Sequence, residues 1–318
     1  LGLGKKMKLI NLIPTNTKIK FMAIRKIAIL ASLALCVGSA VLFLTKGLNY
    51  GIDFRGGILL EIRTAETANL RNIRSNLGSL GLGEIELQRF GNDRDVLIRI
   101  ERQPGGATGQ KIAVDKVKAS LSPTVDYRRT EFVGPKVSAE LVEAGITAVV
   151  LALFAMLMYI WFRFEWQFGV GAVAALAHDV IMTIGVFSLL GLEFNLSTIA
   201  AILTIAGYSI NDTVVVYDRV RENLRKYKVR PLEEVLDMSL NDTLSRTLLT
   251  SVTTLIALLI LYFYGGEVIK GFSFAMIWGV LIGTYSSIYV ATPLLVHMDL
   301  RASAVALPDK ESDAAEAP

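Results

Sequence analysis

Two acidic residues, Asp179 and Asp212, stand inside stretches of the 318-residue sequence that are otherwise apolar enough to cross a membrane. A charge at the bilayer centre costs about 2.5–3.5 kcal/mol on insertion scales, so such a residue is expected to face a bundle interior and to have a partner. Proton binding and release is the chemistry that a carboxylate in this setting can perform. The alternative is a neutral aspartic acid that only links helices through hydrogen bonds.

Asp212 has a candidate partner. Thr204, Tyr208 and Asp212 recur every four residues and share one stripe of a helix, with Asn211 beside them. Arg246 begins a later apolar stretch from the same side of the membrane, so depth allows it to meet Asp212. Protonation of Asp212 would release the arginine and deprotonation would restore the pair, which is a switch between two packings. Arg246 could instead be a basic anchor at the cytoplasmic surface.

His178 directly precedes Asp179. Adjacent residues of a helix point about 100° apart, so we expect these two side chains not to form one paired site. Both a proton relay and a helix-packing polar contact fit this position. Gly279, Gly283 and Ser287 recur every four residues and form a small-residue seam that is typical of tightly packed helices.

The composition excludes several classes of protein. Hydrophobic residues make up 53 % of the chain and charged residues 19 %, against about a quarter in soluble domains, which excludes disordered chains and ordinary soluble enzymes. One Cys and two His exclude a disulfide framework and a His-based zinc site. No P-loop or nucleophile-elbow motif is present. We therefore predict no enzymatic activity, no cofactor and no metal. The intramembrane carboxylates described above make protons the expected coupling ion. The net charge of +4 forms no soluble basic patch, so no nucleic acid is expected.

Six apolar segments are long enough to cross a hydrocarbon core of about 30 Å as helices. We place these spans at 27–44, 144–162, 168–190, 194–217, 247–264 and 271–296. The basic segment 1–26 carries no acidic residue, which puts the N-terminus in the cytoplasm.

Alternation of the spans then places both termini in the cytoplasm and residues 45–137 outside it, ahead of a five-helix membrane region at 138–300. Residues 218–246 are predicted to be a cytoplasmic amphipathic loop, in which Pro231 starts a surface helix that lies on the membrane. The tail 301–318 is predicted to be disordered.

The segment 45–137 is predicted to be a compact α+β domain. Alternating apolar residues indicate strands at 58–63, 84–90, 95–101 and 125–133, and helical spacing indicates helices at 66–80 and 110–121. The order βαββαβ is typical of the ferredoxin-like fold. The fold class is therefore a polytopic α-helical membrane protein with six transmembrane helices and one α+β ferredoxin-like domain.

Several motifs together resemble a known family. They are the GIDFRGG run with Gly51, Asp53, Gly56 and Gly57; the FVGP run ending in Gly134 and Pro135; AHDV at 177–180; GYSINDTVVVYDRVREN at 207–223; SRTLLTSVTT at 245–254; and GTYSSIYVA at 283–291. This set resembles the SecD/SecF family of protein translocase subunits, within the RND superfamily. Ile52 and Phe54 favour the SecF branch over SecD. The resemblance covers about residues 25–300.

The resemblance implies a six-helix RND-type bundle in the bacterial inner membrane, with residues 45–137 in the periplasm. It implies pairing with SecD beside the SecYEG channel, and use of the proton-motive force to help preproteins across. The family's proton-linked acid and arginine carry over onto Asp212 and Arg246. His178 and Asp179 match a motif whose role is left open, and a further proton acid of the family lies on SecD.

Three other functions compete with this one. The first is a proton-coupled RND-type exporter of small molecules or lipids, although such exporters usually carry twelve spans in one chain. The second is a membrane assembly scaffold, which would tolerate neutralisation of Asp212. The third is an intramembrane protease with Asp179 and Asp212 as its catalytic pair, which no further motif supports.

Overall fold

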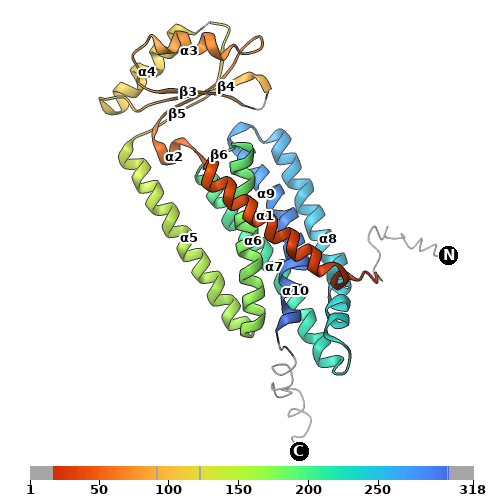
Figure 1. Ribbon diagram of the computed structural model, residues 1–318. Coiled ribbons are helices and arrows are strands. Elements are labelled where there is room, and N and C mark those ends of the chain that lie inside the picture. The colour runs from red at the N-terminus through yellow and green to blue at the C-terminus, as the bar shows by residue number, and fades with distance from the viewer. Residues whose placement is uncertain (1–16, 91, 122, 299, 301–318) are drawn as a thin grey trace, which may run out of the picture. The chain divides into compact units, whose positions relative to one another are not determined.

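The computed structural model describes residues 17–90, 92–121, 123–298 and 300, so the predicted disordered tail lies outside the described residues. The chain divides into two compact units (Figure 1). We call the first the membrane unit; it holds the chain up to Leu48, Leu151–Leu192 and the chain from Ser197 onward. The second, the β unit, holds Asn49–Val150 and Glu193–Leu196.

Within the described residues, six helices are long and apolar enough to cross a membrane, which confirms the predicted number of spans. A 3-10 turn, Phe21–Ile24, leads into the first of them. The helices are α1 (Arg25–Lys46), α5 (Pro135–Arg163), α6 (Trp166–Leu190), α7 (Leu196–Lys226), α8 (Leu232–Tyr264) and α9 (Glu267–Ser286). A π-helical turn, Ser287–Ala291, continues α9 into the short α10 (Thr292–Leu294) and a final 3-10 turn, Leu295–His297.

The predicted start of a helix at Pro231 is confirmed, but residues 218–246 do not form a separate loop between the spans. Helix α7 continues to Lys226, and α8 begins at Leu232, after Pro231 at its N-cap, and runs unbroken into the span. The apolar residues of this extension, Val235, Leu236 and Leu240, are buried in the core of the membrane unit together with residues of α7. The extension therefore packs on protein, because its apolar stripe meets apolar residues in the C-terminal part of α7, and it is not a separate helix on the membrane surface.

The β unit has the predicted βαββαβ order. Its elements are β2 (Gly57–Arg63), α3 (Leu70–Gly78), β3 (Ile85–Phe90), β4 (Asn92–Ile100), α4 (Gly106–Ser120) and β5 (Asp126–Val133). The strands form an antiparallel sheet in the order β3-β4-β2-β5, with α3 and α4 on one face (Figure 1). Helix α3 begins later than predicted, because Asn69 caps it by accepting a hydrogen bond from the Asn72 amide at 3.2 Å.

The core of the β unit lies between the sheet and its two helices. Alternate residues of β2, Ile58, Leu60 and Ile62, are buried there against Leu77 of α3 and Val117 of α4. Three short elements of this unit were not predicted: α2 (Ile52–Arg55), and the strands β1 (Asn49–Tyr50) and β6 (Glu193–Phe194), which pair in parallel.

Candidate functional site

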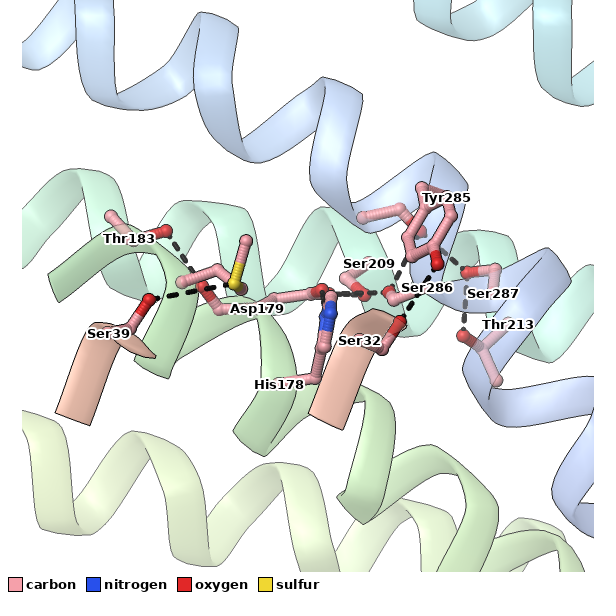
Figure 2. A network of polar contacts seen from close by, with 12 residues as sticks. Ser32, Ser39, His178, Asp179, Thr183, Ser209, Thr213, Tyr285, Ser286 and Ser287 are labelled. Carbon is pink, nitrogen blue, oxygen red and sulfur yellow. Dashed lines mark hydrogen bonds and ion pairs between the residues drawn. The ribbon is translucent and has the colours of Figure 1, made fainter. Parts of the chain in front are cut away.

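Asp179 is the centre of a closed hydrogen-bond network inside the membrane unit (Figure 2). Its side chain is fully buried on α6. Oδ2 accepts hydrogen bonds from Ser209 Oγ of α7 at 2.5 Å and from Ser286 Oγ of α9 at 2.8 Å. Asp179 thus links three helices, and both of its oxygens have partners.

His178 supplies the contact to the other oxygen, which corrects the expectation that the two adjacent residues do not pair. His178 Nδ1 lies 3.0 Å from Asp179 Oδ1, and both side chains are buried. The angle of about 100° separates the Cα–Cβ bonds of the two adjacent residues. Rotation about the side-chain bonds of His178 and Asp179 nevertheless brings the imidazole ring and the carboxylate together. The other ring nitrogen, Nε2, has no hydrogen-bond partner among the described residues. The ring lies 6.0 Å from that of Tyr285, whose hydroxyl contacts Ser32 Oγ of α1 at 2.9 Å.

The predicted seam on α9 explains how Ser286 reaches Asp179. A Cβ atom at Gly279 would lie 2.2 Å from Ile205 of α7, and one at Gly283 would lie 3.2 Å from Ser209, so only small residues fit here. The π-helical turn follows Ser286 directly; its first residue, Ser287, contacts Thr213 Oγ1 of α7 at 2.9 Å. Irregular turns of this kind are frequent at functional sites.

Asp212 is in a different environment. It is only 4 % exposed, yet its Oδ2 has no hydrogen-bond partner among the residues that the structure describes. The Thr247 hydroxyl of α8 is buried near the carboxyl, without hydrogen-bond geometry. Arg246 is exposed, and no ion pair joins it to Asp212 within the described chain. Thr247, rather than its neighbour Arg246, occupies the buried side of α8, but Arg246 lies near enough for its charge to act on Asp212. The pairing of Asp212 with Arg246 stays a prediction.

The other residues of the predicted stripe divide between the interior and the surface. Tyr208 OH donates to Ser251 Oγ of α8 at 3.3 Å, and Ser251 in turn contacts Thr284 Oγ1 of α9 at 2.8 Å. Asn211 is exposed. It belongs to a set of exposed polar side chains on α7 and α8 that we call the polar rim: Thr204, Asn211, Arg246, Thr250 and Thr253. Polar side chains on a membrane span usually face protein.

The motif residues near Gly51 lie in the β unit and form a junction. Asp53 Oδ2 accepts a hydrogen bond from the Leu196 amide at 2.9 Å, so it caps α7. Ser138 Oγ of α5 lies within hydrogen-bond distance of the Asp53 and Phe54 carbonyl oxygens, at 2.9 and 2.8 Å. The first turns of α5 and α7 are therefore both tied to α2.

The glycines and the remaining motif residues allow this junction to close. Gly57 has φ +102°, and a Cβ atom there would lie 2.6 Å from the Ile100 carbonyl oxygen, which requires glycine. Gly51 N donates to Phe194 O at 2.7 Å, and Gly56 takes a positive φ of +69°. Gly134 O accepts from Ser138 N at 2.9 Å at the point where Pro135 opens α5.

Glu193 gives the junction a buried charge. Its Oε1 lies 3.8 Å from Arg99 Nη2, and 13 % of each side chain is exposed. Burial raises the pKa of the Glu193 carboxyl, and the opposing influence of Arg99 and Arg129 does not cancel this effect.

Sequence reasoning missed three residues of these sites: Ser209, Ser286 and Thr247. Ser209 continues the stripe of Ala201 and Ile205, which are both buried on α7, so its spacing could have marked it as facing the interior. Nothing in the sequence distinguishes Ser286 from the seam residue beside it. No group of three or more His, Cys, Asp or Glu side chains that could hold a metal occurs among the described residues.

Comparison with known proteins identifies similar families and relatives. The family described as "Protein export membrane protein SecD/SecF, C-terminal" matches residues 113–301, and the SecD/SecF GG motif matches residues 41–68. The protein translocase subunit SecF of Rickettsia felis is 44 % identical over 292 residues, covering 90 % of this chain and 94 % of that protein. The SecF of Cereibacter sphaeroides is 45 % identical over 298 residues, covering 91 % and 92 %.

Two solved structures are also similar. The crystal structure of SecDF, a translocon-associated membrane protein from Thermus thermophilus, matches with a TM-score of 0.81 and 38 % identity. The match covers 90 % of this chain and 39 % of the SecDF chain. SecDF in its super-membrane-facing form matches with a TM-score of 0.64 and 35 % identity, covering 95 % of this chain and 40 % of the other. This chain therefore spans about two fifths of the SecDF chains.

Proposed function

The chain belongs to the SecD/SecF family of protein export membrane proteins, and on this premise we propose that it uses the proton-motive force to help preproteins cross the bacterial inner membrane through SecYEG. It is a multi-pass membrane protein of the SecF type. In the proposed orientation both termini are cytoplasmic and residues 45–137 are periplasmic.

The observation that carries the proposal is the unpaired carboxylate oxygen of Asp212. A buried carboxylate without its full set of hydrogen bonds is costly when charged and much less costly when protonated. Asp212 is therefore suited to bind a proton when water reaches it from one side and to release it to the other. Pairing with Arg246 would belong to the deprotonated state, in which the arginine turns inward.

Asp179 is suited to transmit a change in the protonation of Asp212 to the packing of the neighbouring helices. Its bond partner Ser209 lies three residues, or about one helical turn, before Asp212 on α7. A shift or rotation of α7 that follows protonation of Asp212 would alter the bond to Asp179, and with it the contact between α6 and α9. His178 would act in the same network, either as a relay for the proton or as a fixed hydrogen-bond partner.

SecD is the proposed partner that covers the polar rim. Exposed polar groups on membrane spans are expected to find partners on neighbouring helices. The similar SecDF chains are more than twice as long as the part that this chain matches, which leaves room for a second half of that kind. SecD would also supply the further proton acid that the family resemblance implies.

The energy available fits such a mechanism. One elementary charge that crosses 100 mV yields about 2.3 kcal/mol, so a few protons suffice to bias a movement between two packings of the bundle. The same number would not unfold a preprotein domain in a single step, because a domain is typically stable by about 5–15 kcal/mol.

The test is preprotein export in inverted inner-membrane vesicles that contain the complete translocase. After the ATP-driven stage has been stopped, completion of transport is measured with and without an uncoupler. Asp212→Asn is expected to abolish the part that depends on the gradient, while the variant still co-purifies with SecD. Asp242→Asn, which neutralises a carboxylate at the surface of α8, is the control and should retain gradient dependence. Normal gradient-dependent export from Asp212→Asn would overturn the proposal and would favour a scaffold.

A further inference from the structure

A charged hollow of about 640 Å³ lies where α5 ends and α7 approaches its own C-terminus, within the membrane unit. It is lined by four cations and two carboxylates: Arg163, Arg221, Arg225, Lys226, Asp218 and Glu222. The α7 residues 218, 221, 222 and 225 share one helical face, because they are three and four positions apart.

Both carboxylates of the hollow already have cationic partners. Asp218 Oδ1 lies 2.5 Å from Arg163 Nη2, and Glu222 Oε2 lies 2.6 Å from Nη1 of Arg219, which is not part of the lining. Among the cations, Arg221 is also paired, because its Nη2 lies 3.8 Å from Glu165 Oε1, whereas Arg225 and Lys226 are exposed and make no ion pair with the described residues. The hollow therefore carries uncompensated positive charge.

Two of the guanidinium groups are held in place by an aromatic ring. Phe164 is buried against Phe168 and Tyr217. The guanidinium carbons of Arg163 and Arg221 lie 4.9 and 5.7 Å from the centre of its ring. The ring, together with the carboxylates of Asp218 and Glu165, restrains both guanidinium groups, which prepares the site for an anion at a lower entropic cost than two free side chains would have.

The surroundings place this hollow at the level of lipid headgroups. Trp161, Phe162 and Trp166, which flank it at the ends of α5 and α6, are 67–78 % exposed. Exposed tryptophans at the ends of spans mark the membrane–water interface. Below Trp166, Val170 and Val173 are exposed on the same face of α6 and offer an apolar strip toward the bilayer interior.

From these four observations we infer that the hollow is a binding site for an anionic phospholipid. The phosphate would lie among Arg163, Arg221, Arg225 and Lys226, and an acyl chain would follow Trp166, Val170 and Val173. Guanidinium groups match the oxygens of a phosphate in pairs, and basic clusters at the membrane surface attract anionic lipids. The adjoining apolar strip assigns the phosphate to a lipid rather than to a free ion.

The test uses quenching of tryptophan fluorescence by brominated lipids in proteoliposomes of the full chain. The chain has three tryptophans. Trp278→Phe in all samples leaves Trp161 and Trp166, beside the hollow, as reporters. Brominated phosphatidylglycerol and brominated phosphatidylcholine are compared at the same mole fraction. Phosphatidylglycerol is expected to quench more strongly, and its advantage should fall by about fivefold for each cation removed in R225Q/K226Q.

A matched control separates a site from general attraction to the membrane surface. K228Q/R230Q removes the same charge from the connection before α8, outside the lining of the hollow. This variant should retain the preference for phosphatidylglycerol. Equal quenching by the two lipids, or an equal loss in both double variants, would overturn the inference. Displacement of phosphatidylglycerol by millimolar inorganic phosphate would show that the hollow binds the free ion and would overturn the assignment to a lipid.

Discussion

Asp179 and Asp212 are both buried carboxylates in the membrane unit, but their surroundings are opposite. Asp179 contacts a histidine and two serines, and every one of these partners belongs to this chain. Asp212 leaves Oδ2 without a hydrogen bond among the described residues, and its neighbour Asn211 is exposed on the polar rim. The first environment is complete within the chain, and the second is incomplete.

The difference separates two uses of a carboxylate in a membrane. A fully bonded carboxylate fixes the positions of the helices that supply its partners, and its removal costs stability. An incompletely bonded carboxylate contributes little to stability, so its protonation state can change without loss of the fold. The four predictions below test this contrast and then the junction and sheet of the β unit, from the largest expected effect to the smallest.

The largest effect on stability is expected from Asp179→Leu. Leucine is close to aspartate in size but has no acceptor oxygen, so the bonds to Ser209, Ser286 and His178 are all lost. At about 0.6 kcal/mol for each hydrogen bond in a membrane, the free energy of unfolding should fall by about 2 kcal/mol. It can be measured by denaturation with sodium dodecyl sulfate in mixed micelles.

Asp212→Leu is the matched control, because it makes the same chemical change at the other carboxylate. Its free energy of unfolding should not fall by more than about 0.5 kcal/mol, since no hydrogen bond to Oδ2 is lost. Equal destabilisation by the two variants would mean that Asp212 is also a structural residue, and the contrast would be lost.

The next effect concerns the polar rim. If SecD covers these side chains, the double variant Asn211→Leu/Thr250→Leu should weaken association with SecD by about eightfold, the equivalent of two hydrogen bonds of ~0.6 kcal/mol each. Energy transfer between labelled subunits in proteoliposomes measures the dissociation constant. Thr45→Leu is the control: like Thr250, Thr45 is exposed and bonds the carbonyl four residues before it. Equal weakening by Thr45→Leu would contradict a specific interface.

Sequence patterns predicted the parts of the fold that depend on hydrophobic periodicity. The six spans and the βαββαβ order follow from long apolar runs and from alternation, and the structure confirms both. The lengths of α7 and α8 were missed because hydropathy reports contact with lipid and does not report where a helix ends. The charged residues at 218–230 resemble a loop by composition, although α7 continues through them as far as Lys226.

The candidate site was predicted only in part. The free-energy cost of placing a charge inside a membrane identified Asp179 and Asp212, but this cost carries no information on which helices pack together. The bonds from Ser209 and Ser286 depend on the register between α6, α7 and α9, which the sequence of one chain does not reveal. For the same reason Thr247, the buried residue beside Arg246, was not predicted to face Asp212.

A smaller effect is expected at the junction of the β unit. Asp53→Ala removes the acceptor for the Leu196 amide and should destabilise the first turn of α7 by about 1 kcal/mol, the typical value of a helix cap. Hydrogen exchange at residues 196–199 measures the change. Asp53→Asn keeps an acceptor oxygen at this position and should retain most of the protection. Unchanged exchange in Asp53→Ala would show that the cap does not hold the helix.

The smallest effect is expected from the pH dependence of the sheet. Arg63 Nε and Nη2 donate to the two carboxylate oxygens of Asp95 across β2 and β4, at 2.6 and 2.7 Å. These bonds, helped by the charge of Arg128, hold the pKa of the Asp95 carboxyl below its ordinary value of 3.8. A carboxyl with a lowered pKa contributes stability that is complete above its unfolded pKa and is lost as the pH falls through the folded pKa.

Asp95→Asn should therefore be less stable than the unmodified chain at pH 7, by less than about 1 kcal/mol because the arginine is partly exposed. The difference should shrink as the pH falls below about 4. Hydrogen exchange of the β2 and β4 amides, corrected for the intrinsic rate at each pH, measures it. Asp126→Asn is the control, since Asp126 pairs with Arg128 at 3.4 Å on the surface, with 66 % of its side chain exposed. A difference for Asp95→Asn that stays constant down to pH 2 would mean that the shape of the side chain, rather than its charge, stabilises the sheet.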